Sequence, residues 1–323
     1  MRAARYHEFG GSDVLTVEDA PKPEPGPGEA LVEVRAAGVN PIDAKLREGV
    51  VSPAPDLPHV AGVDLAGVVR AAGAGVDLSP GDRVFGTGFG WQDPGTFAEY
   101  AAVPADRLAT IPESVSFVDA GASAMVLSTA FRSLVTRGDL AAADACLVHG
   151  GAGGVGHVAV QLAASAGATV VATGREADAE AIRGFGADAV VDYRADDVGE
   201  AVRDAVGPVD VVLETHLGAN LEADLTAIGR GGRVVAIGQG EPVTLDPGTA
   251  LGAMFDDADL RFASTMASTD DHRRVLDRCA RLLADGSVSP AIAATYPLDE
   301  AAAAMDHAVR SGVTGKVVID VTA

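Results

Sequence analysis

Residues 145–175 constrain the fold of this chain more than any other segment. The segment begins with a short apolar run at 145–148 and continues into a glycine-rich sequence at 151–156. Apolar residues then recur at helical spacing as far as residue 166, and Gly167 follows, where helices often end on a glycine. A β-branched run at 169–173 reads as a second strand. Strand, glycine-rich loop, helix and strand predict a βαβ unit of a doubly wound parallel sheet.

The glycine-rich sequence is GAGGVG, which has the GxGxxG spacing of a dinucleotide-binding loop. In such a loop Gly151 permits a tight turn, Gly153 lets the backbone approach a pyrophosphate, and Gly156 lets the helix pack on the strand. The N-terminus of the helix then faces the phosphate charge. Because the flanking strands and helix are present, we interpret the segment as a nucleotide site. The alternative is a glycine-rich turn that binds nothing.

The end of the second predicted strand indicates which dinucleotide binds. An NAD site usually has Asp or Glu here, which accepts hydrogen bonds from the ribose hydroxyls. This chain has Gly174 and Arg175, and a guanidinium can bind a 2′-phosphate that a carboxylate would repel. We therefore expect NADPH rather than NADH. If the strand extends further, Glu176 becomes the ribose ligand and NADH is the cofactor.

Length and charge limit the function classes. A chain of 323 residues is too long for one typical core and suggests two domains. It has 46 acidic and 24 basic side chains, and its only lysines are Lys22, Lys45 and Lys316. Such a surface suits a salt-rich, halophilic cytoplasm, although a GC-rich genome with an acidic proteome is the alternative. The net charge of −22 argues against nucleic acid as a partner.

The number of cysteines and the hydropathy of the chain indicate in which cellular compartment the protein is expected. Cys146 and Cys279 are the only cysteines, and the N-terminus does not resemble a signal peptide. We therefore expect a reducing cytoplasm and no disulfide framework. No apolar run approaches the length of about 18 residues that a membrane span needs.

The rest of the chain divides around the βαβ unit. Before it, short β runs at 30–37, 62–72 and 96–103, a connector at 21–28 and a turn at 79–82 indicate a small irregular β-barrel. After it, further strands are expected at 189–191, 209–213, 233–237 and 260–263, which gives the six strands of a Rossmann sheet. The last part predicts a helix at 270–284, a helix capped by Asp299, and a strand at 316–321 that rejoins the first domain. The expected domains are therefore 1–125 with 266–323, and 126–265.

Six short motifs occur in a fixed order along the chain, at 37–43, 62–64, 81–84, 95–100, 152–156 and 315–318. Together they resemble the zinc-free quinone oxidoreductase branch of the medium-chain dehydrogenase/reductase superfamily, over nearly the whole chain. The resemblance implies a GroES-like β-barrel catalytic domain split around a Rossmann domain, an active site between the two, and a homodimer. Zinc enzymes of the superfamily have a cysteine within the segment aligned with 38–40 and Gly-His-Glu at 62–64. This chain has neither, nor a lobe of four cysteines, so the resemblance implies no metal.

The resemblance implies that two residues, Asn40 and Lys45, lie beside the reacting groups of the cofactor and the substrate. Asn40 occupies the family position beside the nicotinamide, where its amide donates to the substrate oxygen or to the cofactor; the alternative is a turn residue before Pro41. Lys45 stands in a pattern similar to enone and alkenal reductases of plants and bacteria. There its ammonium would polarise the carbonyl of an α,β-unsaturated ketone, and the alternative is a solvated lysine on a helix face.

The expected cofactor-binding residues are Thr129, Gly151, Ala152, Gly153, Gly154, Val155, Gly156, Gly174, Arg175, Tyr193, Ile237, Gly238, Ser264 and Lys316. Thr129 matches a segment that lines the nicotinamide in relatives, and Tyr193 matches a tyrosine near the adenosine phosphate. Asp178 stands where some NADPH-dependent relatives have a lysine, which leaves Arg175 to bind the phosphate. Lys316 either closes the cofactor site or caps a sheet edge. His59 and His157 lie near motifs, and we expect them to be packed or surface residues rather than ligands.

These expectations combine into a function. The chain is expected to transfer a hydride from NADPH to a quinone or an α,β-unsaturated carbonyl, without zinc. Two alternatives remain: a metal-free dehydrogenase of a specific metabolite, and a protein that binds NADPH with little turnover, as crystallin-type relatives do. Loops at 50–58 and 240–254 are expected to shape the substrate pocket, and their sequences do not identify the acceptor.

Overall fold

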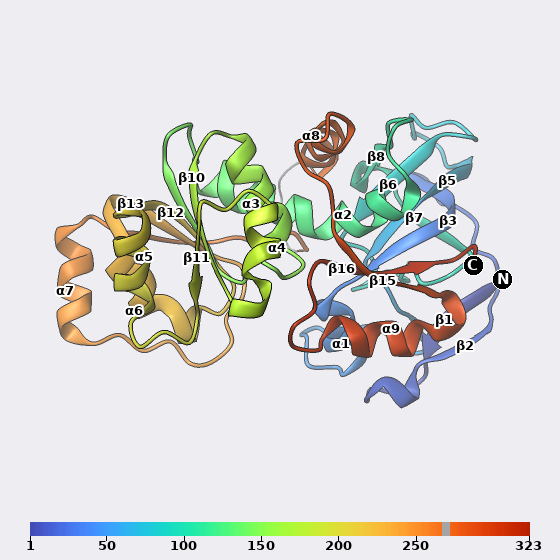
Figure 1. Cartoon of the computed structure of the whole chain (residues 1–323). Helices are drawn as coiled ribbons and strands as arrows, with labels where there is room; N and C mark the ends of the chain where they lie inside the picture. Colours follow the sequence, from blue (N-terminus) through green and yellow to red (C-terminus); the bar gives the residue numbers. More distant parts are fainter. Residues whose placement is uncertain (267–271) are drawn as a thin grey trace. The chain divides into compact units, whose positions relative to one another are not determined.

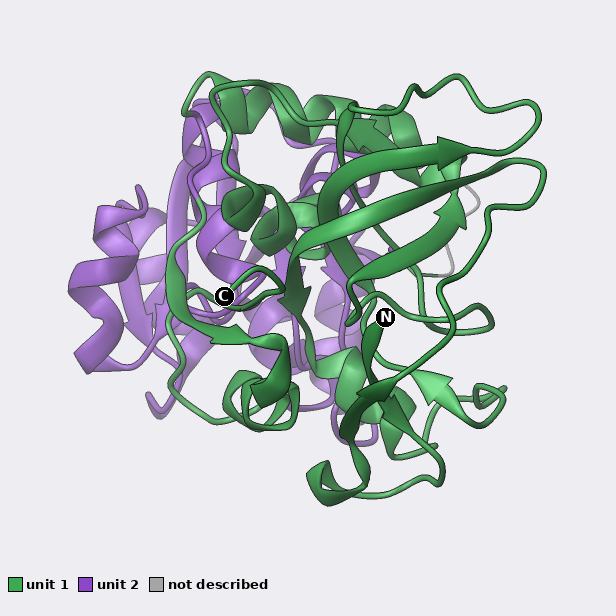
Figure 2. Cartoon of the chain, turned by 90° about the vertical axis from the view of Figure 1, so that its right-hand side faces the viewer, with its two compact units in different colours: residues 1–128, 266–286, 290–323 green, residues 129–265, 287–289 purple. Residues whose placement is uncertain are grey.

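The computed structural model describes residues 1–266 and 272–323, which form two compact units (Figures 1 and 2). Unit 1 comprises Met1–Ser128, Met266–Gly286 and Pro290–Ala323, and unit 2 comprises Thr129–Thr265 and Ser287–Ser289. The expected boundaries at 125/126 and 265/266 lie close to these. The first two residues of the helix expected at 270–284 lie outside the described residues.

Unit 2 is built on one parallel sheet. Its strands are β9 (Ala145–Val148), β10 (Thr169–Gly174), β11 (Ala189–Asp192), β12 (Val209–Glu214), β13 (Ile228–Ala236) and β14 (Asp259–Phe262). They lie in the order β11-β10-β9-β12-β13-β14, and all neighbours are parallel. This is the order of a doubly wound sheet, so the Rossmann expectation is confirmed. The strands read as continuous apolar runs because both faces of such a sheet are covered.

The helices of unit 2 alternate with these strands. They are α3 (Gly156–Ser165), α4 (Ala179–Gly184), α5 (Val198–Val206), α6 (Leu217–Ala227) and α7 (Pro247–Phe255). Gly167 follows α3 with a φ of +83°, a left-handed conformation that explains why a glycine stands at the predicted end of this helix. A π-helical turn (Arg132–Arg137) precedes β9, and a 3-10 turn (Glu176–Asp178) follows β10.

Unit 1 is predominantly β. Its strands are β1 (Arg2–Tyr6), β2 (Thr16–Asp19), β3 (Glu29–Val39), β4 (His59–Val60), β5 (Asp64–Ala72), β6 (Arg83–Thr87), β7 (Tyr100–Pro104), β8 (Leu108–Thr110), β15 (Ile292–Pro297) and β16 (Lys316–Asp320). The larger sheet has the order β15-β16-β3-β5-β6-β8, with β7 also paired to β3. β16 runs antiparallel to β3, with Val317 opposite Val39, so the last strand joins the first domain as predicted. The helices are α1 (Pro41–Arg47), α2 (Phe117–Phe131), α8 (His272–Ala284) and α9 (Ala301–Ala308).

Three local predictions were wrong. The loop expected at 240–254 ends in α7, which begins at Pro247, because Asp246 caps the helix by accepting the N–H of Gly248 (2.6 Å). The strand expected at 96–103 begins only at Tyr100, because the backbone N–H groups of Thr96 and Phe97 donate to the oxygens of Gly62 (3.1 Å) and Ala61 (2.8 Å), which lie between β4 and β5. Asp299 is not a helix cap. It lies in the 3-10 turn Leu298–Glu300, and its carboxylate accepts a hydrogen bond from Arg2 (2.7 Å). Within the described ranges, none of the helices has the length and hydrophobicity required to cross a membrane.

Candidate functional site

The glycine-rich loop of unit 2 has the packing that a dinucleotide site requires. A Cβ atom on Gly151 would lie 2.7 Å from Cβ of Ala172, and one on Gly156 would lie 2.0 Å from the oxygen of Gly150. A Cβ on Gly153 would meet only that oxygen, at 3.3 Å. The first and third glycines are therefore needed for packing, whereas the second leaves the loop open on its outer side.

The exposure of the loop agrees with this packing. Gly151, Ala152 and Gly156 are buried, whereas residues 153–155 are partly exposed, Gly154 among them. Val155 is the N-cap of α3, so backbone N–H groups at the start of this helix lack intrahelical partners. Such groups and the helix dipole favour an anion. The residues present therefore fit a diphosphate.

The end of β10 carries the predicted selectivity residues. The strand ends at Gly174, so Glu176 does not belong to it. A Cβ on Gly174 would lie 2.3 Å from Cδ1 of Ile182, so a larger residue here requires that terminal methyl group to move. The Arg175 guanidinium donates to both carboxylate oxygens of Asp178, at 2.6 and 2.7 Å. This hydrogen bonding lowers the pKa of Asp178.

A second arginine beside this position was missed by the sequence analysis. Arg194 follows Tyr193 after β11 and donates to both carboxylate oxygens of Asp192, at 2.9 and 2.6 Å. Its guanidinium lies 5.7 Å from the ring centroid of Tyr193, a side chain that is 52% exposed. The hydrogen bond to Asp178 raises the pKa of Arg175, and the nearby charge of Arg194 opposes that rise. Two arginines and an exposed aromatic ring therefore gather where the adenosine end is expected.

The remaining predicted residues of unit 2 lie at or just beyond strand ends or pair with a residue there. The Thr129 and Thr265 hydroxyl oxygens are 2.8 Å apart. Ile237 donates its N–H to the backbone oxygen of Glu214 (2.8 Å), and Gly238 approaches the backbone of Thr215 so closely that a Cβ would lie 2.0 Å from its oxygen. Ser264 is exposed shortly after β14. In doubly wound sheets ligands bind beyond the carboxyl ends of the strands, so these positions are compatible with cofactor binding. The individual roles of these residues stay predictions.

In unit 1 the structure brings Asn40 and Lys316 together. Asn40 is the N-cap of α1 and is 3% exposed. Its amide nitrogen donates to Oδ2 of Asp64 (2.8 Å) and to the backbone oxygen of Gly38 (3.2 Å), while its side-chain oxygen accepts from Nζ of Lys316 (2.8 Å). Both amide hydrogens of Asn40 are thus engaged within unit 1. The catalytic role of Asn40 stays a prediction.

Burial governs the electrostatics of this cluster. It raises the pKa of Asp43 to about 8 and that of Asp64 to about 6. Burial lowers the pKa of Lys316, against the opposing charges of Asp64 and Asp43. Asp43 also accepts a hydrogen bond from the backbone N–H of Asn40 (2.7 Å). One ammonium therefore faces two carboxyl groups, of which Asp43 holds its proton more tightly.

Lys316 does not cap a sheet edge, because β16 lies between β15 and β3. The contact of Lys316 with the cofactor stays a prediction.

Lys45, by contrast, is exposed on α1, and no side-chain hydrogen bond or ion pair joins it to any described residue. His59 and His157 are buried as expected. Their ring nitrogens contact the backbone oxygens of Gly90 (3.0 Å) and Gly153 (2.9 Å) respectively.

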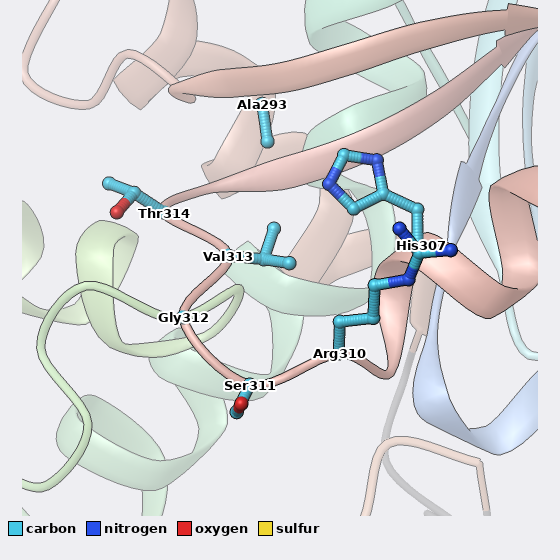
Figure 3. A pocket seen from close by; sticks show the side chains of 7 residues that line it. All are labelled: Ala293, His307, Arg310, Ser311, Gly312, Val313 and Thr314. Carbon is cyan, nitrogen blue, oxygen red and sulfur yellow. The ribbon is translucent and has the colours of Figure 1, made fainter.

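Unit 1 also contains a cavity of about 400 Å³ beside the segment that leads from α9 into β16 (Figure 3). Its lining residues are Ala293, His307, Arg310, Ser311, Gly312, Val313 and Thr314. His307 and Arg310 lie at one end of it and Thr314 at the other (Figure 3). None of the predicted site residues lines this cavity.

Comparison with known proteins identifies the family. Residues 26–113 match the model of the alcohol dehydrogenase GroES-like domain, and residues 185–319 match that of zinc-binding dehydrogenases. A quinone oxidoreductase from Pongo abelii is 32% identical over 326 residues, which span 99% of this chain and 97% of the relative. An NADPH-dependent alkenal/one oxidoreductase from the chloroplast of Arabidopsis thaliana is 33% identical, over 99% of this chain and 79% of the relative.

A solved structure described as an NAD-dependent alcohol dehydrogenase superimposes with a TM-score of 0.91 at 31% identity, over 99% of this chain and 100% of the other. The expected combination of a GroES-like domain with a Rossmann domain is thereby confirmed. With relatives of this identity along almost its entire length, the chain belongs to the medium-chain dehydrogenase/reductase superfamily of oxidoreductases.

Proposed function

We propose that this chain is an NADPH-dependent oxidoreductase that transfers a hydride to a quinone or an α,β-unsaturated carbonyl without zinc. The observation that carries the proposal is the glycine-rich loop, in which Gly151 and Gly156 are tightly packed whereas residues 153–155 are partly exposed. The names of two relatives, a quinone oxidoreductase and an alkenal/one oxidoreductase, support the acceptor classes. When bound, the nicotinamide ring supplies the hydride.

Within this proposal, residues 151–156 hold the diphosphate through backbone N–H groups. Gly174 supports NADPH, because it leaves the end of β10 without the carboxylate that would select NADH. Arg175 and Arg194 supply the charge for a 2′-phosphate. Each guanidinium is already paired with an aspartate, so the phosphate has to compete with Asp178 and Asp192. We therefore propose a preference for NADPH rather than exclusion of NADH.

Lys45 is the proposed donor to the acceptor oxygen. Negative charge develops on that oxygen as the hydride arrives, and a nearby ammonium stabilises it. The Lys45 ammonium has no side-chain partner among the described residues, whereas the amide hydrogens of Asn40 are already bonded to Asp64 and Gly38. Asn40 then contributes by fixing the start of α1.

The same cluster supports chemistry without zinc. The two segments that carry zinc ligands in the zinc enzymes contain Asn40 and Asp64 here, and they are hydrogen-bonded to each other. The ammonium of Lys316 binds to Asn40 and, by its charge, interacts with Asp64. A divalent cation at this place would be repelled by that ammonium and lacks a thiolate ligand.

The test is NADPH oxidation with 1,4-benzoquinone and with but-3-en-2-one, measured in low and in molar salt. Turnover of either acceptor by protein that metal analysis shows to be zinc-free supports the proposal. Binding of NADPH without turnover of either would favour the binding-protein alternative. Oxidation of an alcohol that depends on added zinc would contradict the proposed zinc-free reductase.

We also propose a homodimer formed through one face of unit 2. Large apolar side chains are exposed on α7 and on β14, the edge strand of the sheet. These side chains are 42–76% exposed, and they are Leu251, Met254, Phe255, Leu260 and Phe262. Val243 and Leu245, in the segment before α7, are 43% and 37% exposed. Such a patch favours association with a second copy. Light scattering should give twice the chain mass for the wild type and for the control Val309→Asp, and the single-chain mass for Phe262→Asp.

A further inference from the structure

A buried polar cluster lies directly beneath the glycine-rich loop, and the proposed reaction does not use it. His149 follows β9 and immediately precedes Gly150, and it is 2% exposed. Its Nε2 lies 2.8 Å from Oδ1 of Asp224 on α6 and 3.5 Å from Oε2 of Glu214 at the end of β12. Both carboxylates are fully buried.

The other ring nitrogen of His149 connects this cluster to the loop. Nδ1 lies 3.1 Å from the hydroxyl oxygen of Thr173 on β10. That oxygen also accepts the N–H of Gly150 (3.1 Å), while the backbone oxygen of Thr173 accepts the N–H of Gly151 (2.8 Å). One threonine therefore holds two successive amides at the entrance of the loop, and His149 holds the hydroxyl of that threonine.

The entrance matters because the rest of the loop is built on it. Gly150 has a φ of +67°, and its backbone oxygen accepts the N–H of Gly153 (2.9 Å). The same oxygen is the atom against which Gly156 packs. A shift of Gly150 would consequently move both the open glycine and the start of α3.

The two carboxylates behind His149 are only partly satisfied. Oε2 of Glu214 and Oδ2 of Asp224 have no hydrogen-bond partner among the described residues. Oε1 of Glu214 accepts from the backbone N–H of His216 and from Asn220 (3.2 Å). Leaving buried carboxylate oxygens without donors is costly, so a positive imidazole or a retained proton is needed to compensate.

We propose that the His149–Thr173 pair is a positioning device for the diphosphate of the dinucleotide, and that the carboxyl groups behind it make diphosphate binding depend on pH. This inference rests on the proposed function, since it concerns the cofactor which that function requires. His149 acts through Thr173 and the loop amides, so it is a positioning residue rather than a catalytic one.

The direction of the pH dependence follows from the groups that face His149, namely Glu214 from β12, Asp224 from α6 and the neutral Thr173 from β10. Burial lowers the pKa of His149, but the charge and hydrogen bond of Asp224 outweigh this and raise it overall. Burial raises the pKa of Glu214 to about 7, and the charge of Asp224 acts in the same direction. Above neutral pH the cluster therefore gains a negative charge near the loop, which opposes an anionic ligand.

The first experiment compares two variants of Thr173, with ADP-ribose as the probe because its pyrophosphate does not change charge near neutral pH. Thr173→Val keeps the shape but removes the hydroxyl, and Thr173→Ser keeps the hydroxyl but removes a methyl group. We expect Thr173→Val to weaken binding about tenfold, the equivalent of one hydrogen bond, and Thr173→Ser to bind within about twofold of wild type. A packing role would give the reverse order, with Thr173→Ser the weaker binder, and would overturn the inference.

The second experiment measures the dissociation constant of ADP-ribose at pH 6 and pH 8. Wild-type affinity should fall about three- to tenfold over this interval, as expected for one added charge nearby. Glu214→Gln should show a smaller fall than wild type, because it removes the carboxyl group that gains the charge. Asp210→Asn is the matched control: it alters a carboxylate at the opposite end of β12, one that accepts the N–H of Ala145 (2.8 Å), and it should keep the wild-type profile. Equal pH profiles for wild type and Glu214→Gln would overturn the pH dependence.

A third measurement needs no ligand and separates the two proposals. Hydrogen exchange of the Gly150 and Gly151 amides should be faster in Thr173→Val than in wild type and unchanged in Asp210→Asn. If wild-type protein binds no ADP-ribose but shows this exchange pattern, the proposed function and the pH dependence of diphosphate binding both fail, and only the role of Thr173 in holding the loop amides stands. Unchanged exchange in Thr173→Val, or a stoichiometric metal ion bound between His149 and the carboxylates, would overturn the inference.

Discussion

The ammonium nitrogen of Lys316 lies 2.8 Å from the side-chain oxygen of Asn40, and both residues are buried. The contact joins the first residue of β16 to the cap of α1, although the two residues are 276 positions apart. Because Asn40 also bonds to Asp64, one lysine fixes the arrangement of a carboxylate and an amide at the proposed active site.

Lys316→Met is expected to destabilise the protein strongly. Removal of the ammonium leaves the buried Asp64 without its compensating charge, a change that typically costs about 3–5 kcal/mol. The free energy of unfolding, measured by urea denaturation at pH 7, should fall by that amount. The control is Lys22→Met, which removes an exposed ammonium 3.5 Å above the Tyr100 ring and should have a small effect. Part of the loss should be recovered by Asp64→Asn in the Lys316→Met background, and an unchanged unfolding midpoint in Lys316→Met would contradict the account.

The stability of the ligand-free protein should decrease as the pH rises. Burial raises the pKa of Asp43 from 3.8 to about 8, so the folded protein retains a proton that the unfolded chain loses. The stability associated with this proton is fully present below 3.8 and is lost as the pH rises through about 8. Asp43→Asn should flatten this decline, because it removes the titrating carboxyl group while its amide oxygen can still accept the N–H of Asn40. Part of the slope should remain, because the pKa values of Asp64 and Glu214 are also raised. Denaturation midpoints at pH 5 and pH 8 test this, with the exposed Asp77→Asn as control; equal slopes for wild type and Asp43→Asn would rule it out.

Cofactor preference should respond in opposite directions to two neighbouring substitutions. Arg175→Ala should raise KM for NADPH far more than KM for NADH. The loss of charge-assisted hydrogen bonds to the 2′-phosphate should cost about 1–3 kcal/mol of binding free energy for NADPH alone. Asp178→Asn should lower KM for NADPH, because it removes both the competitor for Arg175 and a negative charge near the 2′-phosphate. Steady-state kinetics with both cofactors give the two ratios. Equal effects of Arg175→Ala on NADPH and NADH would withdraw the NADPH assignment.

Lys45→Met should lower kcat for but-3-en-2-one more than for 1,4-benzoquinone. The enone depends on activation of its carbonyl, whereas the quinone is already a strong acceptor. Lys22→Met serves again as control, because it removes another exposed lysine from unit 1. Unchanged kcat for both acceptors in Lys45→Met would identify Lys45 as a solvated surface residue.

The Rossmann unit was largely predictable because its constraints are local. The spacing of Gly151, Gly153 and Gly156 reflects backbone approach within a short segment, and the apolar runs of buried parallel strands stand out from their surroundings. The sequence also identified Gly174 as standing where an NAD site usually has an acidic residue. The structure adds a reason that the sequence does not contain, namely contact with Ile182 from the following helix.

Contacts between distant segments were not predictable in the same way. Sequence patterns marked Asn40 and Lys316 separately, but their hydrogen bond depends on β16 lying beside β3. Pairing of Arg175 with Asp178 depends on the 3-10 turn that follows β10. His149 directly precedes the glycine-rich loop, which was a clue to its position, but its partner Asp224 belongs to a helix 75 residues later. Long-range side-chain pairing of this kind is set by packing rather than by local propensity.

Unit 2 is inserted within the sequence of unit 1, and β16 is made after it. During synthesis the Rossmann sheet can assemble while the β-rich unit still lacks the strand that pairs with β3. Until that strand arrives, Asp43 and Asp64 lack the nearby ammonium of Lys316, and Asn40 lacks its hydrogen bond from Lys316. The nascent chain is therefore expected to complete its Rossmann unit before its β-rich unit, and if the proposed nucleotide site is correct, a ribosome-stalled chain ending at residue 310 should already retain ADP-ribose.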